Sequence, residues 1–245
     1  MSGGPRRTLW RTFVGSASGR EDLKLSGPPP GEPMLMALDR LEWARRVDMS
    51  NFVNAYYQLR DVGRCGAVQK ILIAGPGQGL DRLVLKWRSY RVTTLDVDPI
   101  FRPDILGSVH RMGMFRDGEF DVVIASHVLE HLPPSLLDDA LREVARVGRY
   151  ALIYVPVHGI HLQLRVRSSY RNMDRSCIVD LHSPLASPSD RIAAFMDGNH
   201  FWEIGVPGYG LKSFANRLRV SFEILDSYRN PDWLPSYNFV LRSIT

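Results

Sequence analysis

The chain has 245 residues, of which 44% are hydrophobic and 23% charged, values that are ordinary for a globular protein and fit one large domain. The formal net charge of +5 is small for a chain this long. The two cysteines, Cys65 and Cys177, exclude a disulfide framework and favour a reducing compartment, for which we expect the cytoplasm. No apolar run approaches the roughly 18 residues of a membrane helix.

The N-terminal segment is basic and interrupted by glycine and proline. Its first 20 residues hold four arginines and no acidic residue, and they lack the apolar core of a secretory signal. Residues 26–33 (SGPPPGEP) cannot continue a helix and indicate a linker. We therefore expect residues 1–33 to form a disordered basic tail with a linker, with a transit peptide as the alternative. Residues 34–245 should form a single domain.

A helical pattern opens this domain, and strands then alternate with helices. Residues 34–59 read as a helix that breaks near residue 48, where Asp48 or Ser50 can cap a second helix. The strands expected after it cover residues 68–74, 92–96, 105–106, 120–125 and 151–155, and the helices cover residues 79–86 and 136–147. Strands this apolar are buried on both faces, so the alternation predicts a doubly wound α/β fold with a mostly parallel sheet.

The pattern changes after the fifth strand. Residues 158–209 have weak periodicity and are too long for a simple connection, so we expect an inserted cap over the carboxyl edge of the sheet. A helix at residues 211–218 and strands at 221–228 and 237–244 then complete the domain.

A glycine-rich loop, residues 75–79 (GPGQG), separates the first buried strand from its helix. Glycine permits tight turning and a close approach of the backbone to a ligand. The spacing is G-x-G-x-G, typical of domains that bind S-adenosylmethionine (SAM), and not the dinucleotide pattern G-x-G-x-x-G. Asp96 ends the next strand, where a carboxylate can accept hydrogen bonds from both ribose hydroxyls, with Asp98 as the alternative. An ordinary turn and a helix cap are the structural alternatives for the loop and for Asp96.

Several segments together resemble the class I SAM-dependent methyltransferases. They read ILIAGPGQG, TLDVDP, PDILGSVHRM, FDVVIASHVLEHLP and ALREVARVGRYALIYVP, in the family's order from about residue 68 to 157. The later stretches HFWEIGVPGYGLKSF and SYRNPDWLPSYNFVLR look like one small subgroup. The resemblance implies a seven-stranded sheet with an antiparallel last strand, and SAM as the cofactor. The expected cofactor-binding residues are Gly75, Pro76, Gly77, Gly79, Asp96, Val97, Ser108, Val109 and Ser126.

Two positions depart from that family pattern. Ile73 stands where many members have an acidic residue that helps to hold the methionine amino group. Ser108 stands where many have an aspartate that accepts from the adenine amino group, and a hydroxyl is a weaker acceptor than a carboxylate. Both changes would weaken SAM binding without removing the loop.

Residues 127–131 (HVLEH) match H-x-x-E-H, the inverted zinc-peptidase pattern. Two histidines four residues apart on a helix can share a zinc ion. However, the motif directly follows a predicted strand, Pro133 and Pro134 interrupt any helix, and no third ligand is evident. We therefore expect no metal site.

The carboxyl ends of parallel strands should hold the acceptor of the methyl group. We expect His127 and His158 to be the candidate general bases, with structural histidines as the alternative. The expected acceptor contacts are Tyr154, His161, His200, Trp202 and Glu203. Alternatively, Trp202 only packs the cap onto the core, and the acceptor lies near Tyr57 and the N-terminal helices.

Three functions are compatible with these residues. The first is methyl transfer to a small molecule. The second is methyl transfer to RNA or protein, supported by Arg165, Arg167, Arg171 and Arg175 but opposed by the aspartates among them and by the lack of an RNA-binding module. The third is a non-catalytic scaffold with a SAM-binding fold, to which Ile73 and Ser108 lend slight support.

Overall fold

The computed structural model describes residues 46–168, 170, 173–181 and 200–244, all within the compact unit Arg40–Thr245. The tail and linker expected at residues 1–33, and the helix expected before residue 46, lie outside the described residues. So does Arg171, one of the four arginines considered for RNA binding. No helix among the described residues is long and apolar enough to cross a membrane.

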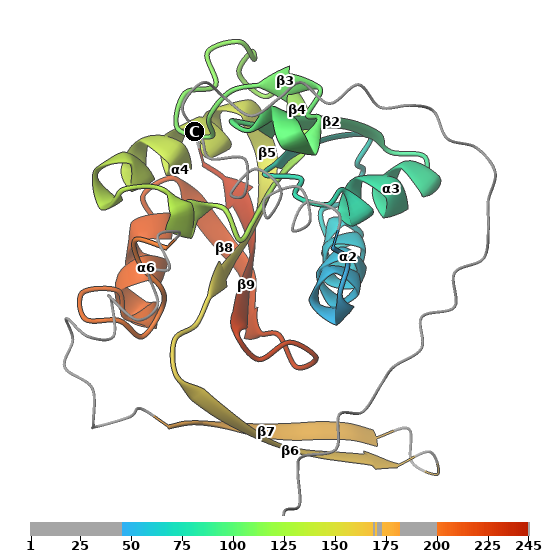
Figure 1. Ribbon diagram of the computed structural model, residues 1–245, viewed down its shortest axis with the longest axis vertical. Helices are drawn as coiled ribbons and strands as arrows, with labels where there is room; N and C mark the ends of the chain where they lie inside the picture. The colour runs from blue at the N-terminus through green and yellow to red at the C-terminus, as the bar shows by residue number, and fades with distance from the viewer. Residues whose placement is uncertain (1–45, 169, 171–172, 182–199, 245) are drawn as a thin grey trace, which may run out of the picture. The chain divides into compact units, whose positions relative to one another are not determined.

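A seven-stranded sheet forms the centre of the described domain (Figure 1). Its strands are β1 (Lys70–Ala74), β2 (Arg91–Asp96), β3 (Ile105–Leu106), β4 (Phe120–Ser126), β5 (Gly148–Pro156), β8 (Phe222–Arg229) and β9 (Ser236–Ser243). Their order is β3-β2-β1-β4-β5-β9-β8, in which β1 to β5 pair in parallel and β9 runs antiparallel to both β5 and β8. The predicted doubly wound sheet with an antiparallel last strand is thus confirmed.

Within the described residues, four α-helices cover the sheet. They are α2 (Met49–Val62), α3 (Leu80–Trp87), α4 (Leu137–Val147) and α6 (Leu211–Leu218). Of the two predicted caps of α2, the structure uses Asp48, whose carboxylate accepts hydrogen bonds from the backbone N–H of Ser50 at 2.9 Å and of Asn51. The described part of the chain also has three short 3-10 helices: η1 (Pro99–Phe101), η2 (Leu129–His131) and η3 (Pro134–Leu136).

The alternation of side chains along each strand divides the core into two layers. In β4, Val123 and Ala125 pack in the layer that contains α4 and α6, whereas Val122 and Ile124 pack in the layer that contains α2 and α3 (Figure 1). Each fully buried aliphatic side chain contributes about 1.5–3 kcal/mol to folding. Burial on both faces explains why these strands are continuous apolar runs in the sequence.

A second sheet lies within the insertion that follows β5. Strands β6 (Ile160–Ser168) and β7 (Met173–Leu181) pair antiparallel and form a two-stranded hairpin. The expectation of weak periodicity was therefore wrong for this part of the insertion. Residues 160–167 (IHLQLRVR) alternate apolar and polar side chains, which is a strand pattern.

Candidate functional site

The strand order reverses between β1 and β4. From β1 the chain continues to β2 and β3 on one side, and from β4 it continues to β5 on the other. The loops that leave the carboxyl ends of β1 and β4 therefore flank a topological switch point, which is where open α/β sheets bind their ligands.

The loop after β1 is built on left-handed glycines. Gly75, Gly77 and Gly79 have φ angles of 69°, 47° and 78°. A Cβ atom on Gly75 would lie 2.3 Å from Cγ2 of Val128, so the loop packs tightly against the chain that leaves β4. A Cβ atom on Gly77 or Gly79 would have no neighbour within 4 Å, which leaves that side of the loop open to a ligand.

Asp96 lies at the carboxyl end of β2, beside this loop. Its Oδ1 accepts a hydrogen bond from the backbone N–H of Asp98 at 2.9 Å, and burial raises its pKa because the charged carboxylate is partly removed from water. The Asp98 carboxylate instead caps η1, accepting from the backbone N–H of Ile100 at 3.0 Å. The helix-cap role considered for Asp96 thus falls to Asp98. Val97 between them is 69% exposed and available to a ligand.

The other expected cofactor residues differ in exposure. Val109 and Pro76 are buried, so they shape the site from within the protein. The Ser108 hydroxyl lies 2.6 Å from Nδ1 of His110, which occupies part of its limited hydrogen-bonding capacity. The Ser126 hydroxyl at the end of β4 is buried and has no hydrogen-bond partner among the described residues.

Four histidines and two glutamates gather beyond the carboxyl ends of β4 and β5. They are His127, Glu130, His131, His158, His200 and Glu203, connected by contacts of His127 with Glu130, His131 with His200, and both His158 and His200 with Glu203. We call this group the His–Glu cluster. The sequence separates its members by up to 76 positions, and only folding brings them together.

His127 is held by its surroundings on both sides of the ring. Its backbone has a φ of 54°, and its N–H donates to the carbonyl of Tyr154 at 2.9 Å. Its Nε2 lies 3.2 Å from Oγ of Ser236, and its Nδ1 lies 3.5 Å from Oε1 of Glu130. Both ring nitrogens therefore face protein groups. The H-x-x-E-H motif forms only the short helix η2, so its two histidines are not presented on one α-helical face.

Glu130 is the most buried member of the cluster. Its side chain is 0% exposed, and neither carboxylate oxygen has a hydrogen bond among the described residues. Burial acts to raise its pKa, but the interactions with His127 and the charge of His131 outweigh burial and lower it. The carboxylate is thus kept ionised by positive or polarisable neighbours. No role was predicted for Glu130, although a charged residue beside the apolar Val128 and Leu129 can indicate a buried functional carboxylate.

The segment that contains Glu203 extends the edge of β5. The backbone N–H of Ile204 donates to the carbonyl of Pro156 at 3.0 Å, and the N–H of His158 donates to the carbonyl of Ile204 at 2.8 Å. Glu203 is 3% exposed and lies 2.7 Å from Nδ1 of His200 through Oε1 and 3.5 Å from Nδ1 of His158 through Oε2. The contact with Glu203 raises the pKa of His200.

Three expected acceptor contacts lie elsewhere. Tyr154 is 0% exposed, and its hydroxyl donates to Asp61 at 2.7 Å. Trp202 is 2% exposed and stacks on Tyr209 in the core, in agreement with the packing alternative. His161 lies 2.7 Å from the guanidinium of Arg229. Of the predicted residues, the structure therefore brings together His127, His158, His200 and Glu203, and leaves these three outside the cluster.

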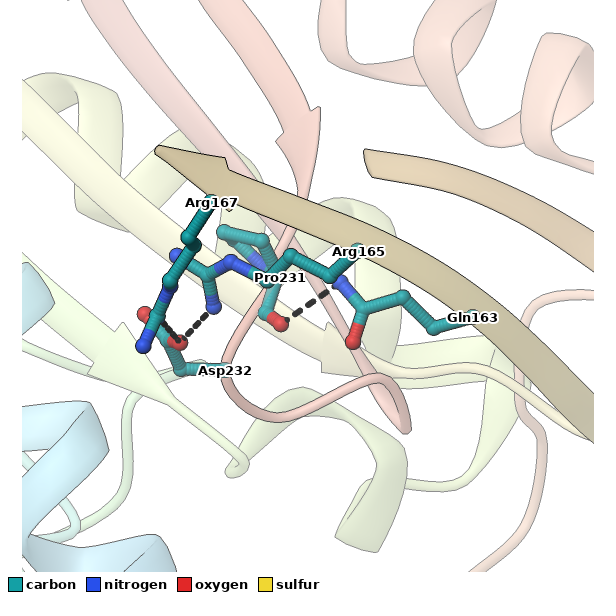
Figure 2. A pocket seen from close by; sticks show the side chains of 5 residues that line it. All are labelled: Gln163, Arg165, Arg167, Pro231 and Asp232. Atoms are coloured by element: carbon teal, nitrogen blue, oxygen red, sulfur yellow. Dashed lines mark hydrogen bonds and ion pairs between the residues drawn. The ribbon is translucent and has the colours of Figure 1, made fainter. Parts of the chain in front are cut away.

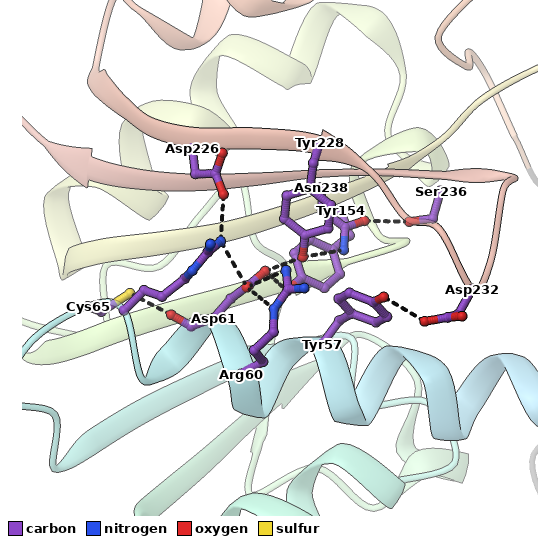
Figure 3. A network of polar contacts seen from close by, with 11 residues as sticks. Tyr57, Arg60, Asp61, Cys65, Tyr154, Asp226, Tyr228, Asp232, Ser236 and Asn238 are labelled. Carbon is purple, nitrogen blue, oxygen red and sulfur yellow. Dashed lines mark hydrogen bonds and ion pairs between the residues drawn. The ribbon is translucent and has the colours of Figure 1, made fainter. Parts of the chain in front are cut away.

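A buried polar network links Ser236 of β9, the neighbour of His127, to Asp61 of α2 (Figure 3). Ser236 donates to Asn238 at 2.8 Å, Asn238 donates to the hydroxyl of Tyr228 at 3.0 Å, and Tyr228 donates to Asp61. Asp61 is 0% exposed and also accepts from Arg60 at 2.8 Å. The sequence does not predict this network, because its members lie on α2, β5, β8 and β9, which only the tertiary fold brings together.

A cavity of about 510 Å³ lies between β6 and the turn that joins β8 to β9 (Figure 2). Its lining residues are Gln163, Arg165, Arg167, Pro231 and Asp232. Arg165 pairs with both Asp174 and Asp232, and Asp232 also accepts a hydrogen bond from Tyr57 at 2.7 Å. Arg165 and Arg167 are thus both paired with nearby carboxylates.

Known proteins match the chain through both its sequence and its fold. Residues 72–150 match the family model of the methyltransferase domain. No curated protein sequence matches the chain. The fold is similar to that of the N-methyltransferase NodS from Bradyrhizobium japonicum in complex with S-adenosylhomocysteine, with a TM-score of 0.55 and 12% identity over 86% of this chain and 98% of that one.

Two further solved structures have the same fold. One is a SAM-dependent methyltransferase from Archaeoglobus fulgidus, with a TM-score of 0.52 and 13% identity over 85% of this chain and 99% of that one. The other is the 1,6-didemethyltoxoflavin-N1-methyltransferase of Burkholderia thailandensis, with a TM-score of 0.50 and 16% identity over 93% of this chain and 99% of that one. Residues 72–150 thus match a methyltransferase domain, and the chain has the fold of SAM-dependent methyltransferases.

Proposed function

We propose that SAM binds between the glycine loop and Asp96, and that its methyl group is transferred to a small molecule held near the His–Glu cluster. One observation carries the proposal: at the point where the strand order reverses, a loop of left-handed glycines opens beside a partly buried carboxylate. Ribose hydroxyls are suitable donors for Asp96, and the exposed Val97 can cover the adenine ring.

The proposed reaction places few demands on the protein. A lone pair of the acceptor forms a bond to the methyl carbon while the carbon–sulfur bond breaks, and the electron pair goes to sulfur, which leaves S-adenosylhomocysteine. Alignment of the three atoms can contribute an effective molarity of about 10⁵–10⁸ M. A base that takes the acceptor proton adds about 10²–10⁴-fold. We assign this role to His158, with His127 as the alternative because both of its ring nitrogens already face protein groups.

Several features favour a small acceptor over RNA. Arg165 and Arg167 both pair with Asp174, so these two arginines are already engaged by a carboxylate and are less available to phosphate. Among the proteins with the same fold, the Burkholderia enzyme holds 1,6-didemethyltoxoflavin, a small molecule. Of the cap expected at residues 158–209, residues 169, 171–172 and 182–199 lie outside the described residues; we propose that the described part caps the site. We also propose that the protein acts in the cytoplasm, where the unpaired Cys65 and Cys177 would stay reduced. Salt-dependent binding of RNA in a gel-shift experiment would favour the RNA alternative.

Replacing Asp96 with alanine should weaken SAM binding at least tenfold while the protein stays folded. Hydrogen bonds that involve a charged group contribute roughly 1.5–3 kcal/mol, and the variant loses those to the ribose. Calorimetric titration with SAM measures the effect. Asp98→Ala is the matched control and should change the affinity less, because its carboxylate caps η1. If Asp96→Ala binds SAM as tightly as the unaltered chain and Asp98→Ala binds it more weakly, Asp98 and not Asp96 contacts the ribose.

Replacing Glu203 with glutamine should reduce turnover while SAM affinity and the melting temperature stay nearly unchanged. Glutamine has the same shape and can still accept from His200, but it lacks the charge that acts on His158 and His200. Release of S-adenosylhomocysteine with a panel of small phenols and amines measures turnover. Glu223→Gln, at an exposed ion pair with Arg242, is the matched control. A variant with lower stability and full activity per molecule would make Glu203 structural and direct attention to the cavity beside Tyr57 and Asp232.

A further inference from the structure

We propose that Glu130, His131 and His200 bind a divalent transition-metal ion such as Zn²⁺. Each residue offers one ligand atom, and these three atoms lie within 4.8 Å of one another. Two imidazoles and one carboxylate form a ligand set used by catalytic zinc sites and by other first-row transition metals. The small adjustment needed to place the three atoms around one ion is within reach of side-chain rotation, because His131 is exposed and His200 is half-buried.

The state of Glu130 is the first independent reason to expect a cation here. Its carboxylate is fully buried, yet both oxygens lack a hydrogen bond among the described residues. The contact with His127, at 3.5 Å, is too long for a hydrogen bond of ordinary strength. Removing a carboxylate from water without a close partner is costly. A bound metal ion would supply that partner directly.

The orientation of His200 is the second reason. Its Nδ1 lies 2.7 Å from Oε1 of Glu203, a buried carboxylate that can only accept, so Nδ1 carries the proton and donates. The tautomer fixed in this way leaves Nε2 with the lone pair that a metal needs. Metal-binding histidines typically donate their other ring nitrogen to a carboxylate in this manner. Glu203 is therefore a positioning residue of the proposed site.

The ligand set differs from the one that the sequence motif suggests. His127 of the H-x-x-E-H pattern is not part of it, and His127 instead approaches Ser236. The third ligand is His200, which the hydrogen bond from the backbone N–H of Phe201 to the carbonyl of Glu130 holds in place at 2.8 Å. No metal was expected from the sequence because no third ligand was evident, and the fold supplies one.

Three protein ligands leave coordination positions open, as in catalytic zinc sites. If the proposed function holds, a hydroxyl oxygen of the acceptor can bind at such a position. The bound metal lowers the pKa of that hydroxyl, so that its proton passes more readily to His158, the base assigned above. The oxygen then forms a bond to the methyl carbon as the carbon–sulfur bond breaks toward sulfur. This step rests on the proposed function, whereas metal binding itself does not.

Zinc titration of the full chain tests the site. We expect protein stripped with a chelator to bind one equivalent of Zn²⁺ in a calorimeter and to melt at a higher temperature when it is bound. His200→Asn and His131→Asn should each weaken this binding at least tenfold, and Glu203→Gln should weaken it by about 10–100-fold. His110→Asn is the matched control and should bind Zn²⁺ as the unaltered chain does.

Two results would overturn the proposal: no stoichiometric zinc binding by the unaltered chain, or zinc binding by His200→Asn and His131→Asn that is as tight as that of the unaltered chain. Glu130→Gln should lose the most zinc affinity, because it removes the charged ligand. Circular dichroism shows whether this variant of a buried residue folds. His131 is exposed, so its variant tests the site without a risk to the core. Titration of the same samples with S-adenosylhomocysteine separates the two proposals. If the protein binds zinc but not S-adenosylhomocysteine, the proposed function is wrong and the metal site stands.

Discussion

Replacing Asp61 with alanine should lower the free energy of unfolding by about 3–5 kcal/mol, because it removes one partner from a buried charged network. Asp61 is 0% exposed and accepts hydrogen bonds from Arg60, Tyr154 and Tyr228. Without the carboxylate, the buried Tyr154 hydroxyl loses its acceptor. Urea unfolding measures the change, and the melting temperature should fall by about 2–4 °C for each kcal/mol.

Asp226→Ala is the matched control for that variant. Asp226 pairs with Arg64 at 2.5 Å, but both side chains are largely exposed, at 42% and 48%. An exposed ion pair contributes about 0–1 kcal/mol, so this variant should be nearly as stable as the unaltered chain. Equal losses in the two variants would mean that burial does not set the strength of the network.

Replacing Gly75 with alanine should destabilise the protein by about 2–5 kcal/mol and weaken SAM binding at least tenfold. The left-handed backbone costs an alanine about 1–2 kcal/mol, and forcing an atom into a filled space costs about 1–3 kcal/mol more. The added Cβ would lie 2.3 Å from Cγ2 of Val128, a short branched side chain that cannot swing away. Thermal unfolding and titration with S-adenosylhomocysteine measure the two effects.

Gly118→Ala separates strain from crowding. Gly118 has a similar φ of 61°, but a Cβ atom there would meet nothing within 4 Å, and the residue lies outside the glycine loop. This control should lose only about 1–2 kcal/mol and bind the cofactor normally. A Gly75 variant that behaves like the Gly118 variant would show that Val128 can move and that the loop is not fixed by packing.

The parts of the fold that could be predicted are those with a strong local signal. The strands near Ile71, Val123 and Leu152 are buried on both faces, so burial alone makes them apolar runs. The glycine loop was recognisable because residues 75, 77 and 79 adopt positive φ angles, which favour glycine, and so leave a G-x-G-x-G pattern in the sequence. Asp96 could be found because it ends one of these strands.

The His–Glu cluster could not be predicted to the same extent. Its contacts join His131 to His200 and His158 to Glu203, pairs that are distant along the chain and have no periodic pattern. Trp202 and Tyr154 show the same limit. Trp202 lies in the expected cap and Tyr154 near the end of a strand, positions that fit a site, and only tertiary packing directs both into the core. The hairpin of β6 was missed for another reason: its alternating pattern was present but lay among irregular polar segments.

The position of β9 between β5 and β8 has a consequence for folding kinetics. Residues 236–243 come last among the described strands, yet they join β8 to the rest of the sheet. On the ribosome, β1 to β5 can therefore assemble first, with the free edge of β5 exposed until β9 emerges. Because β9 closes a long stretch of chain, its docking pays a loop-closure cost and should be a late, slow step. During that interval the nascent domain is most vulnerable to aggregation and most dependent on chaperones.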